Sequence, residues 1–212
     1  MSRDELEKYY DHVRKDVIDL LPAGIVLSKT LDVGCGRGAT SRYLKEKYNI
    51  QETIGIEKCE SIARQAGENV DRIHSMSVES DELPFHPDEF DLILCADVLE
   101  HLADPWRAVE RCAGYLKSGG YFLASLPNVQ NWKIILKLLF GRWHYQESGL
   151  LDRSHLRFFT HKTAVEMLES AGLSIISVKK TMGPEMRLMN ILTCGLFQDL
   201  LSYRIYMCAQ KL

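Results

Sequence analysis

Apolar runs of strand length alternate with helical periodicity along most of the chain, which is the sequence pattern of repeated β-α-β units. The run FDLILCAD at 90–97 is apolar almost throughout, as expected for a strand covered on both faces. The other expected strands are 30–33, 53–57, 72–76, 121–127, 173–181 and a last one within 202–212. The pattern predicts an α/β fold built on a mostly parallel sheet.

Polar residues, prolines and glycines mark the ends of the intervening helices. The expected helices are an opening amphipathic one over about 6–20, then 40–48, one from about 61, 106–117 and 161–172. Asp104 and Pro105 supply the N-cap and the first turn of the fourth helix, and Thr160 caps the fifth. Because no repeat or linker divides the chain, a single domain over 1–212 is expected.

Two apolar segments, at about 128–159 and 184–201, interrupt the alternation. A helix in the first would carry an apolar face with basic side chains mostly elsewhere: Trp132, Ile135, Leu138 and Leu139 against Lys133, Lys137 and Arg142. A lid over an acceptor pocket is the favoured interpretation, followed by a homodimer contact or an extra core helix, and last by an interfacial membrane contact. The second segment would pack with the lid or form a dimer face.

The composition narrows the class of protein but does not indicate a binding partner. The 212 residues are 46% hydrophobic with a formal net charge of −3, which suits a globular domain and disfavours a dedicated nucleic-acid binder. The charged N-terminus lacks the apolar core of a signal peptide, and no run of about eighteen apolar residues occurs, so a cytoplasmic location is expected. The six cysteines and seven histidines show no C-x-x-C or H-x-x-x-H spacing, so no metal site is expected.

The stretch LDVGCGRGATS at 31–41 places three glycines directly after the first strand: Gly34, Gly36 and Gly38. Glycines there permit positive φ and let a ligand approach the backbone, and Glu57 at the tip of the next strand can accept two hydrogen bonds from a ribose diol. The same glycines fit the relaxed dinucleotide fingerprint. However, Asp32 lies two residues before the first glycine, where a carboxylate would repel a pyrophosphate. The motif therefore favours a nucleoside that carries positive charge.

The pattern D-x-G-C-G-x-G after a strand resembles the first motif of class I S-adenosylmethionine-dependent methyltransferases. Other motifs are similar to the subgroup around ubiquinone-biosynthesis O-methyltransferases and MetW-like proteins: DVLEHL at 97–102, LKSGG at 116–120 and LLDRSHLRFFTHKTAVEMLESAGL at 150–173. The resemblance covers about 28–181 and the final strand. It implies a Rossmann-like, seven-stranded, mostly parallel sheet with helices on both faces and the last strand antiparallel.

The function that the resemblance implies is methyl transfer from S-adenosylmethionine to a small-molecule or lipid-like acceptor, with oxygen as the favoured acceptor atom. Such a displacement at a charged sulfur needs in-line positioning and desolvation rather than a nucleophile or a metal. Two other functions stay open. A nicotinamide-dependent oxidoreductase would use the same glycine turn, although Asp32 and the short chain disfavour it. A methyltransferase-fold module could also bind cofactor or a partner without catalysis.

The resemblance also implies where the cofactor lies. Its methionine part is expected near the glycine turn and Asp97, its ribose at Glu57, and its adenine between Lys58 and the turn at Ser77. Many relatives have an aspartate where Ser77 stands, whereas a serine hydroxyl accepts a hydrogen bond from adenine without charge. The full expected set is Asp32, Gly34, Cys35, Gly36, Gly38, Glu57, Lys58, Ser77, Val78 and Asp97.

Residues for the acceptor side are expected after the fourth strand and in the first insertion. His101 is the candidate general base for a hydroxyl acceptor, and the alternative is that it caps the turn or bonds Glu100. The candidate acceptor-binding residues are Tyr10, Asn128, Trp132, His155 and Arg157. For the last two, an ion pair with Asp152 is the competing interpretation, and for Tyr10 it is core packing.

Overall fold

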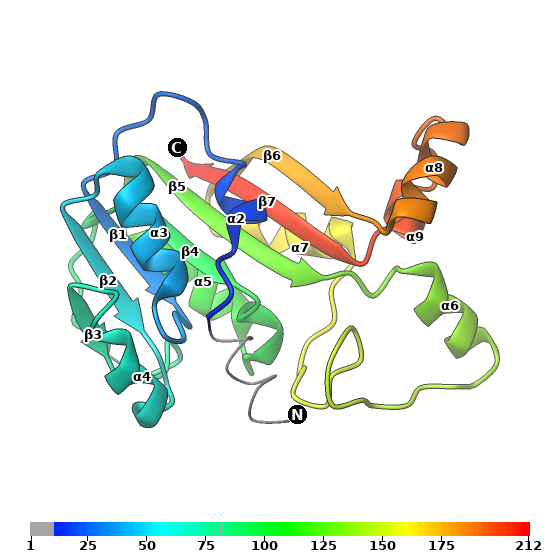
Figure 1. The fold of residues 1–212 in the computed structure, drawn as a ribbon, viewed down its shortest axis with the longest axis horizontal. Helices are drawn as coiled ribbons and strands as arrows, with labels where there is room; N and C mark the ends of the chain where they lie inside the picture. The colour runs from blue at the N-terminus through cyan, green and yellow to red at the C-terminus, as the bar shows by residue number, and fades with distance from the viewer. Residues whose placement is uncertain (1–10, 81) are drawn as a thin grey trace.

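The computed structural model describes residues 11–80 and 82–212, and its centre is a sheet with helices packed around it (Figure 1). Within those residues, seven strands form one sheet in the order β3-β2-β1-β4-β5-β7-β6. The strands are β1 Lys29–Val33, β2 Glu52–Ile56, β3 Arg72–His74, β4 Phe90–Ala96, β5 Leu116–Pro127, β6 Leu173–Thr181 and β7 Arg204–Lys211. Only β7 runs against its neighbours, β5 and β6, which confirms the expected antiparallel last strand.

Helices fill the connections between these strands. They are α2 Lys15–Ile18, α3 Ala39–Tyr48, α4 Glu60–Ala66, the 3₁₀ helix η1 Leu99–His101, α5 Pro105–Tyr115, α6 Trp132–Leu139, α7 His161–Ser170, α8 Pro184–Leu192 and α9 Gln198–Leu201. The expected caps are confirmed: the Asp104 side chain accepts from the backbone N–H of Arg107, and Thr160 and Thr163 form a reciprocal capping box.

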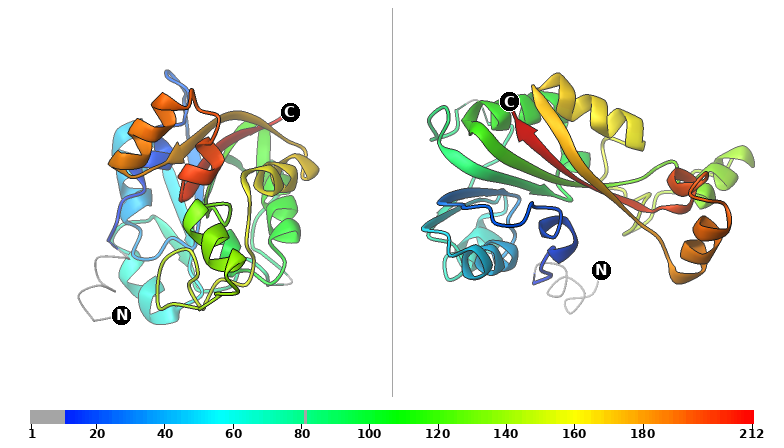
Figure 2. Two further views of the ribbon diagram at one scale, coloured as in Figure 1. Left: turned by 90° about the vertical axis from the view of Figure 1, so that its right-hand side faces the viewer. Right: turned by 90° about the horizontal axis from the view of Figure 1, so that it is seen from above.

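Strand β4 shows why the sheet needs helices on both faces. Successive side chains of a strand point to opposite faces, so Leu92 and Leu94 pack with α2 and α3, whereas Ile93 and Cys95 pack with α5 and α7. Figure 2 shows the two helical layers on either side of the sheet. A near-continuous apolar run is therefore required here, and it is what identifies this strand in the sequence.

The strand order creates a switch point between β1 and β4. The chain first builds outward from β1 through β2 to β3 and then crosses to the other side of β1. In open parallel sheets such a reversal leaves a crevice at the carboxyl ends of the strands, where ligands bind. The glycine turn after β1 and the DVLEHL motif after β4 both lie at this crevice.

Several expected element boundaries are wrong. The strand expected over 72–76 ends at His74 and the helix expected over 161–172 ends at Ser170, and two further differences affect the sheet and its first helix. In the described residues the opening helix is only α2, because residues 12–14 are not helical, and the part before residue 11 lies outside the described residues. The helix expected over 106–117 ends at Tyr115 instead. Leu116 leaves it in an extended conformation because it is fully buried and pairs with Phe90, so β5 begins five residues before the expected strand.

The first insertion forms α6, but its expected apolar face is not buried. Ile134 is the buried side chain of this helix, at 5% exposure, whereas Trp132, Ile135, Leu138 and Leu139 are exposed. The cause lies at the start of α6, where Asn131 caps the helix and its amide also donates to the Ser202 carbonyl, 2.9 Å away. This anchor sets the helix rotation and turns Ile134 inward.

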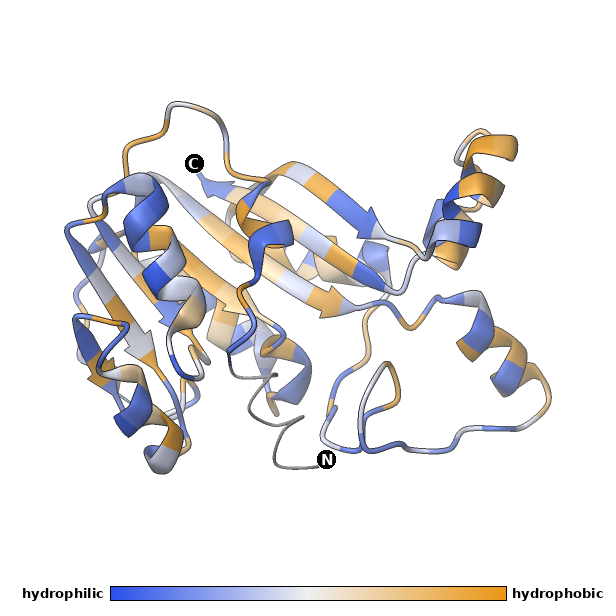
Figure 3. Cartoon of the chain, in the orientation of Figure 1, coloured by the Kyte–Doolittle hydropathy of each residue, from blue (hydrophilic) through white to orange (hydrophobic). Residues whose placement is uncertain are grey.

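The second insertion is also apolar on its surface. Helix α8 has no buried residue among those the structure describes, and several of its apolar residues are exposed. The helix lies beyond the end of the sheet and is rich in hydrophobic residues (Figure 3). Hydrogen bonds join the start of the first insertion to the end of the second, because the Asn128 amide donates to the Asp199 carbonyl and to the Ser202 carbonyl and hydroxyl.

Over the described part of the chain, no helix has the length and apolar content needed to cross a bilayer.

Candidate functional site

A cavity of about 280 Å³ opens at the switch point of the sheet. Its walls come from the ends of β1, β2 and β4, from the segment after β3, and from His12 and Arg14 before α2. Of the residues expected to hold a cofactor, the structure brings these together in the lining: Asp32, Gly34, Cys35, Gly36, Glu57, Lys58, Ser77, Val78 and Asp97. Gly38 is absent from the lining and lies instead at the start of α3, in a left-handed conformation against Asn69 and Val70.

The glycine turn brings the backbone to the cavity wall. Gly34 has φ +67°, and a Cβ there would lie 2.5 Å from Val98 Cγ2, which also lines the cavity. The N–H groups of Gly34 and Cys35 donate to the Ile56 carbonyl, at 2.8 and 3.1 Å. A side chain at residue 34 would therefore strain the turn and push it into the β4 loop.

Glu57 is fixed at the tip of β2 by two backbone donors. The N–H of Gly36 donates to Oε2 at 3.2 Å and the N–H of Cys59 donates to Oε1 at 2.9 Å, and the side chain is buried. Each carboxylate oxygen keeps a second lone pair for a ligand. A carboxylate held in this way can accept from both hydroxyls of a ribose without reorganising.

Asp32 is buried directly behind the glycine turn. Burial raises the pKa of this carboxyl to about 7, the nearby charge of Glu57 adds to the rise, and the hydroxyl of Ser41 and the charge of Arg14 oppose it. Ser41 Oγ donates to Asp32 Oδ2 at 2.6 Å. A cationic ligand group in the cavity would favour the ionised form, whereas a pyrophosphate would not.

Asp97 is held at the end of β4 in a left-handed backbone conformation, with φ +56°. Its Oδ1 accepts from Ser125 Oγ at 2.7 Å, and its Oδ2 forms ion pairs with Arg14 and Arg204 at 3.0 and 3.3 Å. The sequence analysis missed both arginines. Arg14 lines the cavity, yet its sequence surroundings are those of an ordinary charged helix start, so no local signal marks it.

The wall of the cavity at 76–78, where adenine is expected, is less polar than the wall at Glu57, where ribose is expected. Ser77 Oγ accepts from the backbone N–H of Glu79 at 3.1 Å, so one of its lone pairs is used by its own turn. Val78 is buried beside it, and Met76 lies in the same wall. A base would therefore be held mainly by apolar contact and backbone groups, together with the remaining lone pair of the serine hydroxyl.

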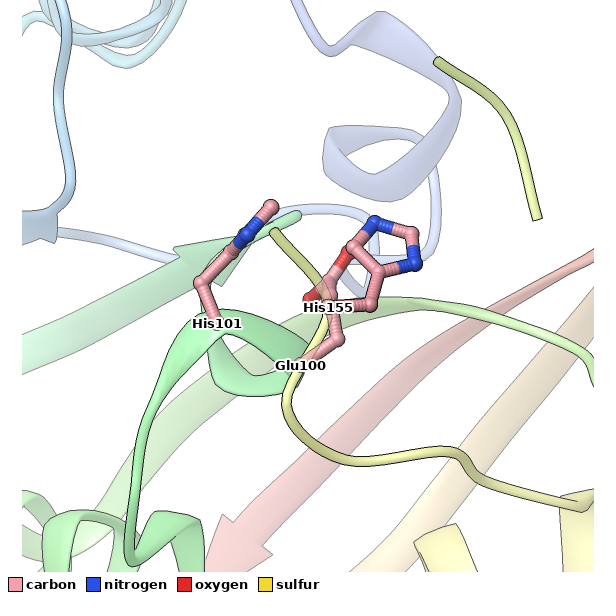
Figure 4. Close-up of side chains that lie close together, drawn as sticks. All are labelled: Glu100, His101 and His155. Atoms are coloured by element: carbon pink, nitrogen blue, oxygen red, sulfur yellow. The ribbon is translucent and has the colours of Figure 1, made fainter. Parts of the chain in front are cut away.

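His101 also lines the cavity and lies close to Glu100 and His155 (Figure 4). The rings of His101 and His155 pack edge to face with centroids 4.8 Å apart. Glu100 is 2% exposed, and its pKa is raised well above the usual range by burial and by the charge of Asp97. His101 does not bond Glu100 but lies with Nδ1 3.1 Å from the Ser154 carbonyl.

The acceptor-side candidates that the structure describes do not line the cavity: Asn128, Trp132, His155 and Arg157. Asn128 is fully buried and its amide is used to fasten the insertions, and Trp132 lies on α6 beyond the sheet. Arg157 forms no ion pair with Asp152 in the described residues, because its guanidinium donates to the Ala103 carbonyl. Tyr10 lies outside the described residues.

Comparisons with known proteins agree with this geometry. The profile of a methyltransferase-domain family matches residues 6–178. The chain is 31% identical over 176 residues to a ubiquinone biosynthesis O-methyltransferase of Aromatoleum aromaticum, covering 76% of this chain and 74% of that one. The corresponding enzyme of Idiomarina loihiensis is 28% identical over 78% of this chain and 70% of its own length. An S-adenosylmethionine-dependent methyltransferase structure from Archaeoglobus fulgidus superposes with a TM-score of 0.71 over both full chains at 17% identity, which establishes the shared fold.

Gly34→Ala is expected to damage both the fold and the cavity. The left-handed backbone and the contact with Val98 should lower the free energy of unfolding by about 1–3 kcal/mol and weaken binding of S-adenosylhomocysteine. Denaturant unfolding and calorimetric titration measure the two effects. The matched control is Gly114→Ala in α5, where nothing lies within 4 Å of the new methyl group, so stability should rise by about 0.5–1 kcal/mol and binding should not change. Equal behaviour of the two variants would contradict this account of the turn.

Binding of S-adenosylhomocysteine is expected to strengthen as pH rises through the pKa of Asp32. With that pKa at about 7, the carboxylate is about one tenth ionised at pH 6 and nine tenths at pH 8, so the affinity should rise about tenfold. Calorimetric titration at both pH values should show this rise in the wild type and lose it in Asp32→Asn. His12, whose pKa is lowered by burial, also lines the cavity, and His12→Gln separates its contribution. A pH dependence that survives Asp32→Asn would assign it to another group.

Proposed function

Because this chain belongs to the methyltransferase-domain family, we propose that it moves a methyl group from S-adenosylmethionine to a hydroxyl oxygen of a small-molecule acceptor. The enzyme class, an S-adenosylmethionine-dependent methyltransferase, follows from the family. The observation that carries the proposal is the Glu57 carboxylate, fixed by two backbone N–H groups opposite the glycine turn.

The residues of the cavity fit this cofactor. Glu57 suits the ribose diol, and the absence of a Cβ at Gly34 leaves the room that a ligand needs beside Val98. Asp32 and Asp97 suit a ligand with positive charge, and Arg14 offers a partner for a ligand carboxylate at the same place. A nicotinamide dinucleotide fits less well, because its pyrophosphate would face these buried carboxyl groups.

The chemistry that the cofactor supplies when bound is a methyl group on a positively charged sulfur, which is already activated for displacement. The protein must position the acceptor in line, exclude water and remove a proton. His101 is suited to the last task. Its Nδ1 faces the Ser154 carbonyl, which can only accept, so the neutral ring carries its proton on Nδ1 and its lone pair on Nε2.

The acceptor is proposed to enter between His101 and the segment after residue 149 of the first insertion. The backbone N–H groups of Leu156 and Arg157 donate to the Glu100 carbonyl at 2.8 and 3.0 Å, and Ser154 lines the cavity. This part of 128–159 therefore acts as the acceptor wall, whereas α6 does not reach the cavity. The relatives named ubiquinone biosynthesis O-methyltransferase support oxygen as the acceptor atom. We propose a phenol as the first acceptor to test.

Three expectations remain predictions. They are the single domain over 1–212 with two functional insertions, the homodimer and the cytoplasmic location. The exposed apolar side chains of α6 and α8 are compatible with a dimer contact but do not identify one.

Glu57→Gln is the variant that tests the proposal. It keeps the shape of the side chain and removes the charge, so binding of S-adenosylhomocysteine should weaken about tenfold or more, and turnover of labelled methyl donor should fall with it. Turnover is measured with a panel of mono- and dihydroxylated phenols. Glu60→Gln, an exposed residue in the first turn of α4, is the matched control and should change neither quantity.

The outcomes separate the competing functions. Binding of S-adenosylhomocysteine without turnover on any acceptor would favour a non-catalytic module. Binding of NADH in its place would favour an oxidoreductase and overturn the proposal. Transfer of label to nitrogen or carbon but not to oxygen would keep the enzyme class and reject the hydroxyl acceptor.

A further inference from the structure

Asp97 is held by two arginines that stand in different places. Arg14, before α2, lines the cavity, whereas Arg204 is the first residue of β7 and is absent from the lining. Both guanidinium groups form ion pairs with Oδ2 of Asp97, at 3.0 and 3.3 Å. We propose that Arg204 is a positioning residue, which keeps Asp97 directed at the amino group of the bound cofactor when Arg14 pairs with the cofactor's carboxylate. This inference rests on the proposed function.

The antiparallel direction of β7 brings Arg204 to the site. The parallel strands β4 and β5 end at the edge of the sheet where the cavity opens, but an antiparallel strand begins at that edge. Arg204 pairs with Pro127, the last residue of β5, and with Thr181, the last residue of β6. A side chain at the start of β7 can therefore reach Asp97, which directly follows β4.

The neighbours of Arg204 hold its side chain in place. Side chains alternate between the faces of a strand, so Arg204 shares a face with Tyr206, which packs in the cluster under α2. Tyr206 pairs with Ser125 of β5, and Ser125 donates to Oδ1 of Asp97 at 2.7 Å. Burial lowers the pKa of Arg204, but the charge of Asp97 and a hydrogen bond to Tyr206 raise it further, so this pKa lies above its usual range. Arg204 is thus a permanent cation beside Asp97.

The two arginines differ in their access to a ligand. A ligand carboxylate in the cavity would compete with Asp97 for the guanidinium of Arg14. Arg204 is not exposed to that competition, because it is absent from the cavity lining. Asp97 is only 7% exposed, and a buried carboxylate that loses its partner is costly. Arg204 therefore keeps Asp97 paired and in one orientation with and without the ligand.

A purely structural role for Arg204 predicts a different pattern of binding. If Arg204 only stabilised the edge of the sheet, its loss would weaken every ligand of the cavity alike. The positioning role predicts a loss confined to ligands that carry an amino-acid group. The reason is that the nucleoside is expected at Glu57 and at the wall formed by 76–78, which follow β2 and β3 and not β4.

The test compares two ligands by calorimetric titration of the full chain. S-adenosylhomocysteine carries the amino-acid group, whereas methylthioadenosine has the same nucleoside and a thioether without it. Arg204→Gln should weaken binding of S-adenosylhomocysteine at least about tenfold and leave binding of methylthioadenosine unchanged. Arg204→Lys keeps the charge but not the planar fork, so it should show a smaller loss, again for S-adenosylhomocysteine alone. Arg72→Gln, an exposed arginine of β3 that is absent from the cavity lining, is the matched control and should bind both ligands as the wild type does.

Thermal melts show whether each variant is folded, and Arg204→Lys provides the result if Arg204→Gln does not fold. Unchanged binding of S-adenosylhomocysteine by that folded variant, or an equal loss of affinity for both ligands, would overturn the positioning role and leave the proposed function standing. A wild type that binds methylthioadenosine as tightly as S-adenosylhomocysteine would also overturn it, because the amino-acid group would then have no site at Asp97. A wild type that binds neither ligand would reject the proposed function itself.

Discussion

Four carboxyl groups are buried where β1, β2 and β4 end, and the cost of keeping them out of water organises the site: Asp32, Glu57, Asp97 and Glu100. Three of them have partners that relieve this cost. Asp32 accepts from a serine and burial raises its pKa to about 7, Glu57 accepts from two backbone N–H groups, and Asp97 pairs with two arginines. Oε2 of Glu100 has no hydrogen-bond partner among the described residues. A cavity with such walls suits positive charge and sugar hydroxyls better than it suits a pyrophosphate.

The sheet makes this concentration of acids unavoidable. Because both faces of the central strands are buried, their polar side chains can stand only at the strand ends, and the parallel arrangement brings those ends to one edge. That is why the sequence predicted the sheet, and why most of the residues predicted to bind the cofactor line one cavity. Asp32 lies near the end of β1, and the glycine turn, Glu57 and Asp97 follow directly after β1, β2 and β4, so local patterns place them together.

The acceptor side was less predictable because it depends on contacts between distant segments. His155 meets His101 only because the backbone of the insertion pairs with Glu100, and no ligand spacing in the sequence records that pairing. The rotation of α6 is likewise set by an amide of Asn131 bonding Ser202, a contact that periodicity cannot reveal. Asn128 was predicted to bind the acceptor because its residue type suits binding. Its side-chain amide instead donates to Asp199 and Ser202, which are distant in the sequence.

The central claim is that the acidic cavity at the switch point holds a cationic nucleoside with its reactive end toward the histidines. A crystal structure with S-adenosylhomocysteine tests this claim most directly. The account predicts ribose hydroxyls on Glu57, the amino group near Asp97 and Asp32, and the sulfur facing His101. A ligand bound elsewhere, or bound here with its sulfur turned away from His101, would contradict it.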